Sequence, residues 1–167
     1  FELTVYNRTR SKAEDLLTKG AKWADSPAAV AKASDVVITM VGFPHDVKEV
    51  YLGKNGILSA KEGGIVIDMT TSGPKLAEQI HTAAAKKGVL ALDAPVSGGD
   101  IGARNATLVI MAGGDERAYH DMEPIFGILG RKSCYFGKAG SGQYTKMANQ
   151  IAIASGMIGV SEALAYA

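Results

Sequence analysis

Short apolar runs recur along this 167-residue chain, and the segments between them alternate polar and apolar residues with helical spacing. Six of these runs have the length and composition of β-strands. Several are continuously apolar, which is typical of parallel strands covered on both faces. The predicted strands are Leu3–Tyr6, Val36–Val41, Ile65–Met69, Val89–Asp93, Thr107–Ala112 and Ser133–Phe136.

Helices are predicted between these strands from their start and stop signals. Strands that alternate with helices indicate an α/β fold, a Rossmann-type doubly wound parallel sheet. Ligands of such folds bind at the carboxyl ends of the strands, so the following loops should carry the function. The signals are Ser11 with Glu14 (a capping box), Ser26 with Pro27, Pro74 with Gly88 as the stop, and Asp115 before a helix toward Phe126.

The last segment has a different pattern, because Glu162 is its only charged residue between Met147 and Ala167. Small and polar residues interrupt it and its flanks lack a charge bias, so we expect a largely buried helix rather than a membrane span. The chain begins within a strand-like run and ends within this helix, so we expect further polypeptide at both ends. A second, helical domain should start near Gly137–Gly140.

Composition narrows the class of protein. Hydrophobic residues make up 47% and charged residues 21%, which indicates a soluble globular domain. The net charge of +1 gives no support to a nucleic-acid or anionic membrane partner. Cys134 is the only cysteine, which excludes a disulfide framework or a cysteine-based metal site within the chain. No signal peptide is recognisable, and we expect a cytoplasmic location.

The most informative stretch is GSGQYTKMANQ at residues 140–150. Lys146 and Asn149 are three positions apart on the predicted helix and share a face. Burial lowers a lysine pKa toward neutrality, so Lys146 is a candidate general acid or base. The alternative is a solvated lysine that follows an ordinary Gly-Ser-Gly loop.

The loop after the first predicted strand is basic and contains Asn7, Arg8 and Thr9. In dinucleotide folds, an acidic residue here would hold the ribose 2′-hydroxyl, whereas arginine accommodates a 2′-phosphate. A basic, solvated loop is the alternative interpretation. The glycine-rich phosphate loop that precedes this strand in such folds is absent from the chain.

Three further loops follow the predicted strands. Val41, Gly42, Phe43 and Pro44 end the second strand and let the backbone approach a ligand. The hydroxyl-rich segment 70–72 precedes a helix and can serve a polar ligand as well as capping. Ser97, Gly98 and Gly99 offer a hydroxyl and free backbone N–H groups that suit a carboxylate, although a tight turn is the simpler interpretation.

The segments DMTTSGP, DAPVSGG and GSGQYTKMANQ, in this order, resemble the β-hydroxyacid dehydrogenases. That family includes 3-hydroxyisobutyrate dehydrogenase, tartronate semialdehyde reductase and glyoxylate/succinic semialdehyde reductases. The resemblance implies that Lys146 exchanges the proton of the substrate hydroxyl as hydride moves to or from a nicotinamide. It assigns the substrate to Ser97, Gly98, Gly99 and Asn149, and the cofactor to Asn7, Arg8, Thr9, Val41, Gly42, Phe43, Pro44 and Thr71.

The same resemblance implies NADP(H) as cofactor, with NAD(H) as the alternative, and a small hydroxy acid or semialdehyde as substrate. It divides the chain into a dinucleotide-binding domain at residues 1–138 and a helix opening the C-terminal domain at residues 139–167. The apolar C-terminal helix carries Gly156 and Gly159, which allow close packing against another helix, so we expect a homodimer or homotetramer formed through the C-terminal helices.

The chain departs from the family pattern in places. Gln150 stands where many members have asparagine, and Ala106 where glycine often precedes the Thr-Leu pair. Phosphate-binding residues of a 6-phosphogluconate dehydrogenase are not identifiable, and Lys146 argues against imine reductases, which often replace it. The rival of another class is a non-catalytic, dehydrogenase-like binding module, which would have no need of a proton donor such as Lys146.

Overall fold

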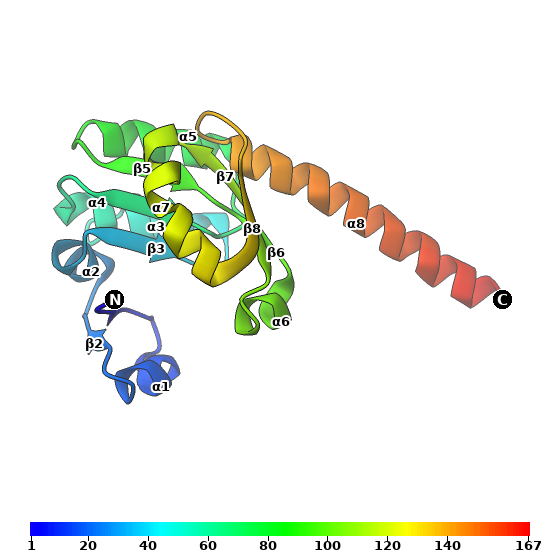
Figure 1. Cartoon of the computed structure of the whole chain (residues 1–167), viewed down its shortest axis with the longest axis horizontal. Coiled ribbons are helices and arrows are strands. Elements are labelled where there is room, and N and C mark those ends of the chain that lie inside the picture. Colours follow the sequence, from blue (N-terminus) through cyan, green and yellow to red (C-terminus); the bar gives the residue numbers. More distant parts are fainter.

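A six-stranded sheet with helices on both faces forms the body of the chain, and one long helix projects from it (Figure 1). This arrangement comes from a computed structural model that describes residues 1–167. The strands are β1 Thr4–Val5, β2 Lys22–Trp23, β3 Val36–Thr39, β4 Ile65–Asp68, β5 Leu90–Asp93, β6 Val96–Ser97, β7 Leu108–Gly114 and β8 Gly130–Tyr135. The helices are α1 Glu14–Leu17, α2 Pro27–Ala33, α3 Pro44–Leu52, α4 Ile57–Ala60, α5 Pro74–Ala85, α6 Gly99–Arg104, α7 Glu116–Leu129 and α8 Ser141–Tyr166, with a 3-10 turn at Arg10–Ala13.

Alternate residues of the strands pack into two separate hydrophobic cores, one on each face of the sheet. Helices therefore cover both faces, and the predicted doubly wound fold is confirmed. On β4, Ile65 and Ile67 pack in the core covered by α7, together with Tyr119 and Phe126. Val66, between them, faces the opposite core with residues of α2, α3, α4 and α5. A strand buried on both faces must be apolar at every position, which accounts for the continuous apolar runs in the sequence.

The sheet is parallel over β3, β4 and β5, as predicted, and the one departure from the predicted parallel sheet is the reversed direction of β7 relative to β5. β7 runs antiparallel to both β5 and β6, in one unbroken register that pairs Asp93 with Gly113 and Ser97 with Val109. Pro95 lies between β5 and β6, and its carbonyl accepts the backbone N–H of Met111 at 2.9 Å. Segment 98–107 is too short for the crossover that a parallel return needs, so the chain folds back beside the same strand.

The first 23 residues contain a parallel pair of short strands, β1 and β2, that is not hydrogen-bonded to the main sheet. The capping box predicted here is wrong, because Ser11 lies within the 3-10 turn and α1 has no side-chain cap. The guanidinium of Arg10 instead stacks 5.2 Å from the centre of the Trp23 ring. Ser26 does cap α2, and its hydroxyl accepts the N–H of Ala29 at 3.1 Å.

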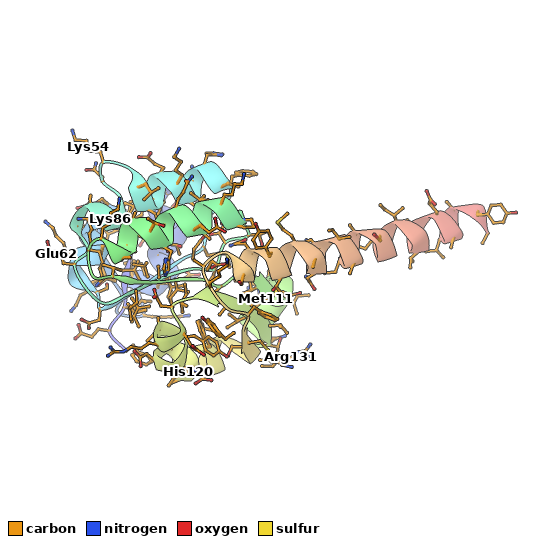
Figure 2. All side chains as sticks on the ribbon, turned by 90° about the horizontal axis from the view of Figure 1, so that it is seen from above. Lys54, Glu62, Lys86, Met111, His120 and Arg131 are labelled. Atoms are coloured by element: carbon orange, nitrogen blue, oxygen red, sulfur yellow. The ribbon has the colours of Figure 1, made fainter.

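Helix α8 leaves the body after its first turns, and its side chains stand clear of the rest of the chain (Figure 2). Every residue from Ile151 to Ala167 is exposed, where the sequence predicts burial on most sides. The predicted burial is not observed because nothing within the 167 residues covers this part of the helix. No helix of the structure, α8 included, has the combination of length and hydropathy that a membrane span requires.

Candidate functional site

The last residues of three parallel strands lie side by side and place polar groups at the carboxyl edge of the sheet. Thr39 of β3 pairs in register with Asp68 of β4, which pairs with Asp93 of β5. All three side chains are buried. Buried polar groups require hydrogen-bond partners, and here those partners come from the loops predicted to carry function.

Asp68 organises the loop that follows β4. Its carboxylate accepts hydrogen bonds from the Thr39 hydroxyl at 3.0 Å, the Thr70 N–H at 3.1 Å and the Ser72 hydroxyl at 3.3 Å. Burial raises the pKa of Asp68, and these hydrogen bonds oppose the rise. Thr70 Oγ1 in turn accepts the N–H of Val41, which ties this loop to the one after β3.

The three hydroxyls of segment 70–72 therefore differ in role. Thr70 and Ser72 are used within the protein, as the preceding bonds show. Thr71 is exposed and is the member of the set that stays accessible to a ligand. This is the hydroxyl that the family resemblance assigns to the cofactor.

Asp93 holds the start of α8. Its two carboxylate oxygens accept the backbone N–H groups of Gly140 and Gln143, each at 2.8 Å. These donors belong to the first turn of the helix and its cap, where backbone N–H groups lack partners within the helix and the helix dipole favours an anion. Burial raises the pKa of Asp93, and the two backbone hydrogen bonds lower it.

The first turn of α8 also lies against the sheet at a distance that only glycine permits. A Cβ added at Gly142 would collide with the carbonyl oxygens of Asp93 and Met111. A Cβ added at Gly113 of β7 would lie 2.6 Å from the Gly142 nitrogen. The glycines of the GSGQ segment and of β7 thus allow the helix to dock directly on the ends of β5 and β7.

Lys146 lies one turn further along the same face of α8. It is only 7% exposed, and burial lowers the pKa of its ammonium. A lysine of this kind can lose a proton at lower pH than a solvated one, as proton transfer chemistry requires. Asn149 is partly buried, and its amide donates to Gln150 Oε1 at 3.3 Å.

Ser97, Gly98 and Gly99 lie where the extension of β5 ends and α6 begins. Ser97 is the last residue of β6 and is partly buried. Gly98 and Gly99 have φ angles of +129° and +62°, values that side chains with a Cβ rarely adopt. The predicted turn is therefore present. No hydrogen bond joins Ser97 to Lys146, but both of their segments adjoin Asp93. β6 follows this last residue of β5 after two residues, and the start of α8 is docked on its carboxylate.

The basic loop at residues 7–9 is tied to the start of α3. Arg8 Nη1 donates to Asp46 Oδ1 at 2.9 Å, while its side chain remains 77% exposed. Asp46 Oδ2 accepts the N–H of Phe43, so one carboxylate holds both the arginine and the loop after β3. The Asn7 side chain accepts the N–H of Thr9 at 2.9 Å and shapes the loop itself.

The loop after β3 presents its side chains to solvent. Phe43 is 63% exposed and stacks on His45, with ring centroids 5.6 Å apart. Gly42 and Pro44 are also exposed, and Pro44 begins α3. The structure therefore brings this loop, Arg8 and segment 70–72 into one hydrogen-bonded arrangement at the carboxyl edge of the sheet.

Sequence reasoning missed four residues of this arrangement: Asp46, Thr70 as a bridge, Asp93 and Gln143. Asp93 was predicted only as the end of a strand, and Asp46 was not predicted as a site residue. A carboxylate two positions after Pro44, at the start of a helix, is the signal that would have identified Asp46. The structure holds no group of three or more His, Cys, Asp or Glu side chains arranged to bind a metal ion.

Comparison with known proteins places the chain in a family. Residues 1–137 match the model of the NAD binding domain of 6-phosphogluconate dehydrogenase. An uncharacterized oxidoreductase of Bacillus subtilis strain 168 is 60% identical over 98% of this chain and 57% of its own length. A probable 3-hydroxyisobutyrate dehydrogenase-like protein of Arabidopsis thaliana, described as mitochondrial, is 52% identical over 100% of this chain and 50% of its own length.

A solved structure shares the same fold. Psf3 in complex with NADP+ and 2-OPP superimposes with a TM-score of 0.89 and 31% identity, covering all of this chain and 61% of that one. The fold, the loops at its carboxyl edge and these similarities define an NAD(P)-binding domain of the dehydrogenase type. The chain belongs to the β-hydroxyacid dehydrogenase family, whose cofactor domain is shared with 6-phosphogluconate dehydrogenase. It spans about half the length of the curated relatives it matches.

Proposed function

We propose that the protein carrying this chain is an oxidoreductase that interconverts a small β-hydroxy acid and its semialdehyde, with NADP(H) preferred over NAD(H). The observation that carries the proposal is the buried Lys146 on a helix docked on Asp93, at the carboxyl edge of a dinucleotide-binding sheet. Ligands of open α/β sheets bind at this edge, so Lys146 stands where a reacting group is needed.

The residues at this edge suit a nicotinamide dinucleotide. Thr71 offers an exposed hydroxyl, and the loop of Gly42 and Phe43 offers exposed backbone and an aromatic face. Arginine has five N–H donors, so Arg8 keeps donors for a 2′-phosphate while one is held by Asp46. When bound, the nicotinamide supplies the hydride acceptor or donor of the reaction.

The chain's own contribution to the chemistry is proton transfer and charge stabilisation. In the oxidation of a hydroxy acid, neutral Lys146 takes the hydroxyl proton as the C–H bond gives up its hydride. In the reverse direction the Lys146 ammonium returns that proton to the carbonyl oxygen and stabilises the charge developing there. Ser97, Gly98 and Gly99 are proposed to receive the substrate carboxylate, and Asn149 to contact a polar group of the substrate.

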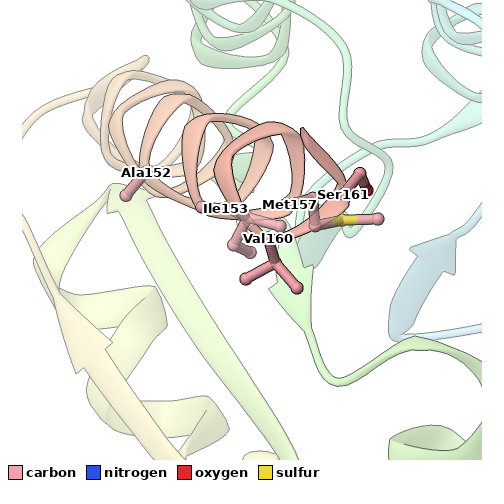
Figure 3. Close-up of a pocket in the computed structure, with 6 residues that line it drawn as sticks. Ala152, Ile153, Met157, Val160 and Ser161 are labelled. Atoms are coloured by element: carbon pink, nitrogen blue, oxygen red, sulfur yellow. The ribbon is translucent and has the colours of Figure 1, made fainter. Parts of the chain in front are cut away.

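The proposal extends to assembly and location. The apolar residues of α8 that stay exposed need covering, and a shallow hollow on this helix has an apolar lining (Figure 3). We propose that a second copy packs along α8 to give a homodimer or homotetramer.

A cytoplasmic location is in line with the single, unpaired Cys134, and fractionation of cells tests it.

The experiment uses the full-length protein that carries this chain. Consumption of NADPH and NADH is followed with tartronate, methylmalonate and succinic semialdehydes and with glyoxylate. We expect turnover of at least one of them, faster with NADPH. Cofactor binding with no turnover across a wider set of hydroxy acids and semialdehydes would instead support the alternative, a non-catalytic dehydrogenase-like binding module.

A further inference from the structure

The side chain of Gln143 joins the helix of Lys146 to the loop that contains Thr71. Gln143 Oε1 accepts the N–H of Ser72 at 3.0 Å, and Gln143 Nε2 donates to the carbonyl of Thr70 at 2.8 Å. The side chain is 1% exposed, so both bonds are shielded from water. A buried amide with both its donor and its acceptor engaged by backbone fixes the two segments in one relative position.

The connection continues on both sides of Gln143. Thr70 accepts the N–H of Val41 through its hydroxyl, which extends the link to the loop after β3. In the other direction, Gln143 and Lys146 are three positions apart on α8 and share a face. One path of short hydrogen bonds and a single helical turn therefore runs from the proposed cofactor loops to the buried lysine.

We propose that Gln143 is a positioning residue that sets the place of Lys146 relative to the proposed cofactor loop 70–72. This inference rests on the proposed function. Asp93 anchors the same turn of α8 through backbone N–H groups alone, so the helix stays docked when the Gln143 side chain is changed. Loss of the Gln143 bonds should therefore shift Lys146 against the reacting atoms rather than detach the helix.

The test compares Gln143→Met with Asp115→Ala in the full-length protein. Met fills a similar volume but makes neither hydrogen bond. Asp115 is the matched control, because its side chain, like that of Gln143, accepts a hydrogen bond from a backbone N–H group. The donor is Ala91 of β5 at 2.8 Å, and this bond lies outside the described site. Misplacement of a reacting group by about 1 Å lowers rates by roughly 100-fold, so we expect kcat of Gln143→Met to fall by about 10- to 100-fold.

Two readouts separate positioning from a loss of folded protein. The KM values of Gln143→Met should stay close to wild type, and its primary deuterium isotope effect, measured with NADPH labelled at the transferred hydrogen, should rise. Asp115→Ala should change neither the isotope effect nor kcat. A Gln143→Met enzyme with the kcat and isotope effect of the Asp115→Ala control would overturn the inference. Gln143→Asn, which keeps the amide but shortens its reach, replaces the Met variant if the latter does not fold.

A measurement without turnover distinguishes this inference from the proposed function. In the wild-type protein, NADPH should slow amide hydrogen exchange at residues 70–72 and also at residues 141–146. In Gln143→Met the protection should remain at 70–72 and be lost at 141–146. Equal protection of 141–146 in both proteins, or none in wild type, would overturn the role of Gln143. Failure to turn over any hydroxy acid, with these exchange results obtained, would count against the proposed reaction alone.

Discussion

Arg8 is bonded to Asp46 across 38 positions of sequence, and this pair joins the basic loop after β1 to the first turn of α3. The bond leaves the guanidinium largely exposed, with its direction set by a carboxylate that is itself buried. An arginine oriented in this way loses less freedom when it binds an anion than one that moves freely in solvent.

Replacing Arg8 should change the choice of cofactor. A charge-assisted hydrogen bond is worth about 1.5–3 kcal/mol, so Arg8→Ala should raise the KM for NADPH by about tenfold or more and leave the KM for NADH nearly unchanged. Steady-state kinetics with both cofactors measures this. Arg10→Ala is the control, because Arg10 stacks on Trp23 instead. Equal effects of Arg8→Ala on the two cofactors would refute the phosphate-binding role.

Replacing Lys146 should remove most of the turnover. General acid–base groups contribute about 10²–10⁴-fold, so kcat of Lys146→Ala should fall within that range while cofactor affinity is retained. Lys146→Arg should be similarly impaired, because arginine keeps its proton at all working pH values. Turnover assays and cofactor titration check both variants, and wild-type kcat in either would rule out the assigned role.

The rate of hydroxy acid oxidation should rise with pH, and the rise should occur at a lower pH than the pKa of an exposed lysine. Oxidation needs neutral Lys146, and burial lowers its pKa from 10.5, so kcat should increase through a pKa under that value and then level off. The reverse reaction needs the ammonium and should lose activity over the same interval. Complete pH profiles of both directions test the sign. An oxidation rate that still climbs at pH 10.5 would show that the lysine is not desolvated.

Substitution of Gly142 should destabilise the fold through backbone collision. A Cβ there meets the carbonyl oxygens of Asp93 and Met111, and overpacking of this kind costs about 1–3 kcal/mol. Gly127→Ala in α7 is the control, because an added Cβ has no neighbour within 4 Å there. Chemical denaturation should show a lower free energy of unfolding for Gly142→Ala only. Identical curves for the two variants would mean that α8 docks less closely than described.

Charges on the exposed face of α8 should weaken the proposed self-association. Ile153 and Met157 line the hollow on this helix, and their exposed apolar side chains are the ones a second copy would cover. The double variant Ile153→Lys with Met157→Lys should sediment as a smaller species than wild type. Ile128→Lys, at another exposed apolar residue, which lies on α7, should leave the assembly unchanged. An unaltered sedimentation coefficient in the α8 variant would exclude this face.

The sequence predicted the fold class because its strongest signals were local. Continuous apolar runs located β3, β4, β5 and β7, and Ser26 with Pro27 located the start of α2. The reversal of β7 was not predicted, since strand direction depends on the length of the connection rather than on the strand's own composition. The short elements β2, β6, α4 and α6 were also missed, because segments of two to six residues carry little periodic signal.

The candidate site was predicted in part for a related reason. Lys146, Thr71 and the glycines after Ser97 stand in recognisable motifs, and their roles stay predictions. Asp46, Asp93 and Gln143 act through partners 38 to 73 positions away, and no local pattern reveals such pairs. Asp115 was predicted to cap α7, but its carboxylate bonds the N–H of Ala91 and lies 3.2 Å from His81 Nε2.

Within this chain, helix α8 is held only at its base. Its 26 residues span about 39 Å at 1.5 Å per residue, and its buried residues, Gly142, Gln143 and Lys146, all lie in the first two turns. Because the helix is this long, a rotation of about 5° at its base moves its far end by roughly 3 Å. A force applied at the far end exerts a torque on the base that grows with the same length. Whatever binds the outer part of α8 therefore bears mechanically on the turn that carries Lys146.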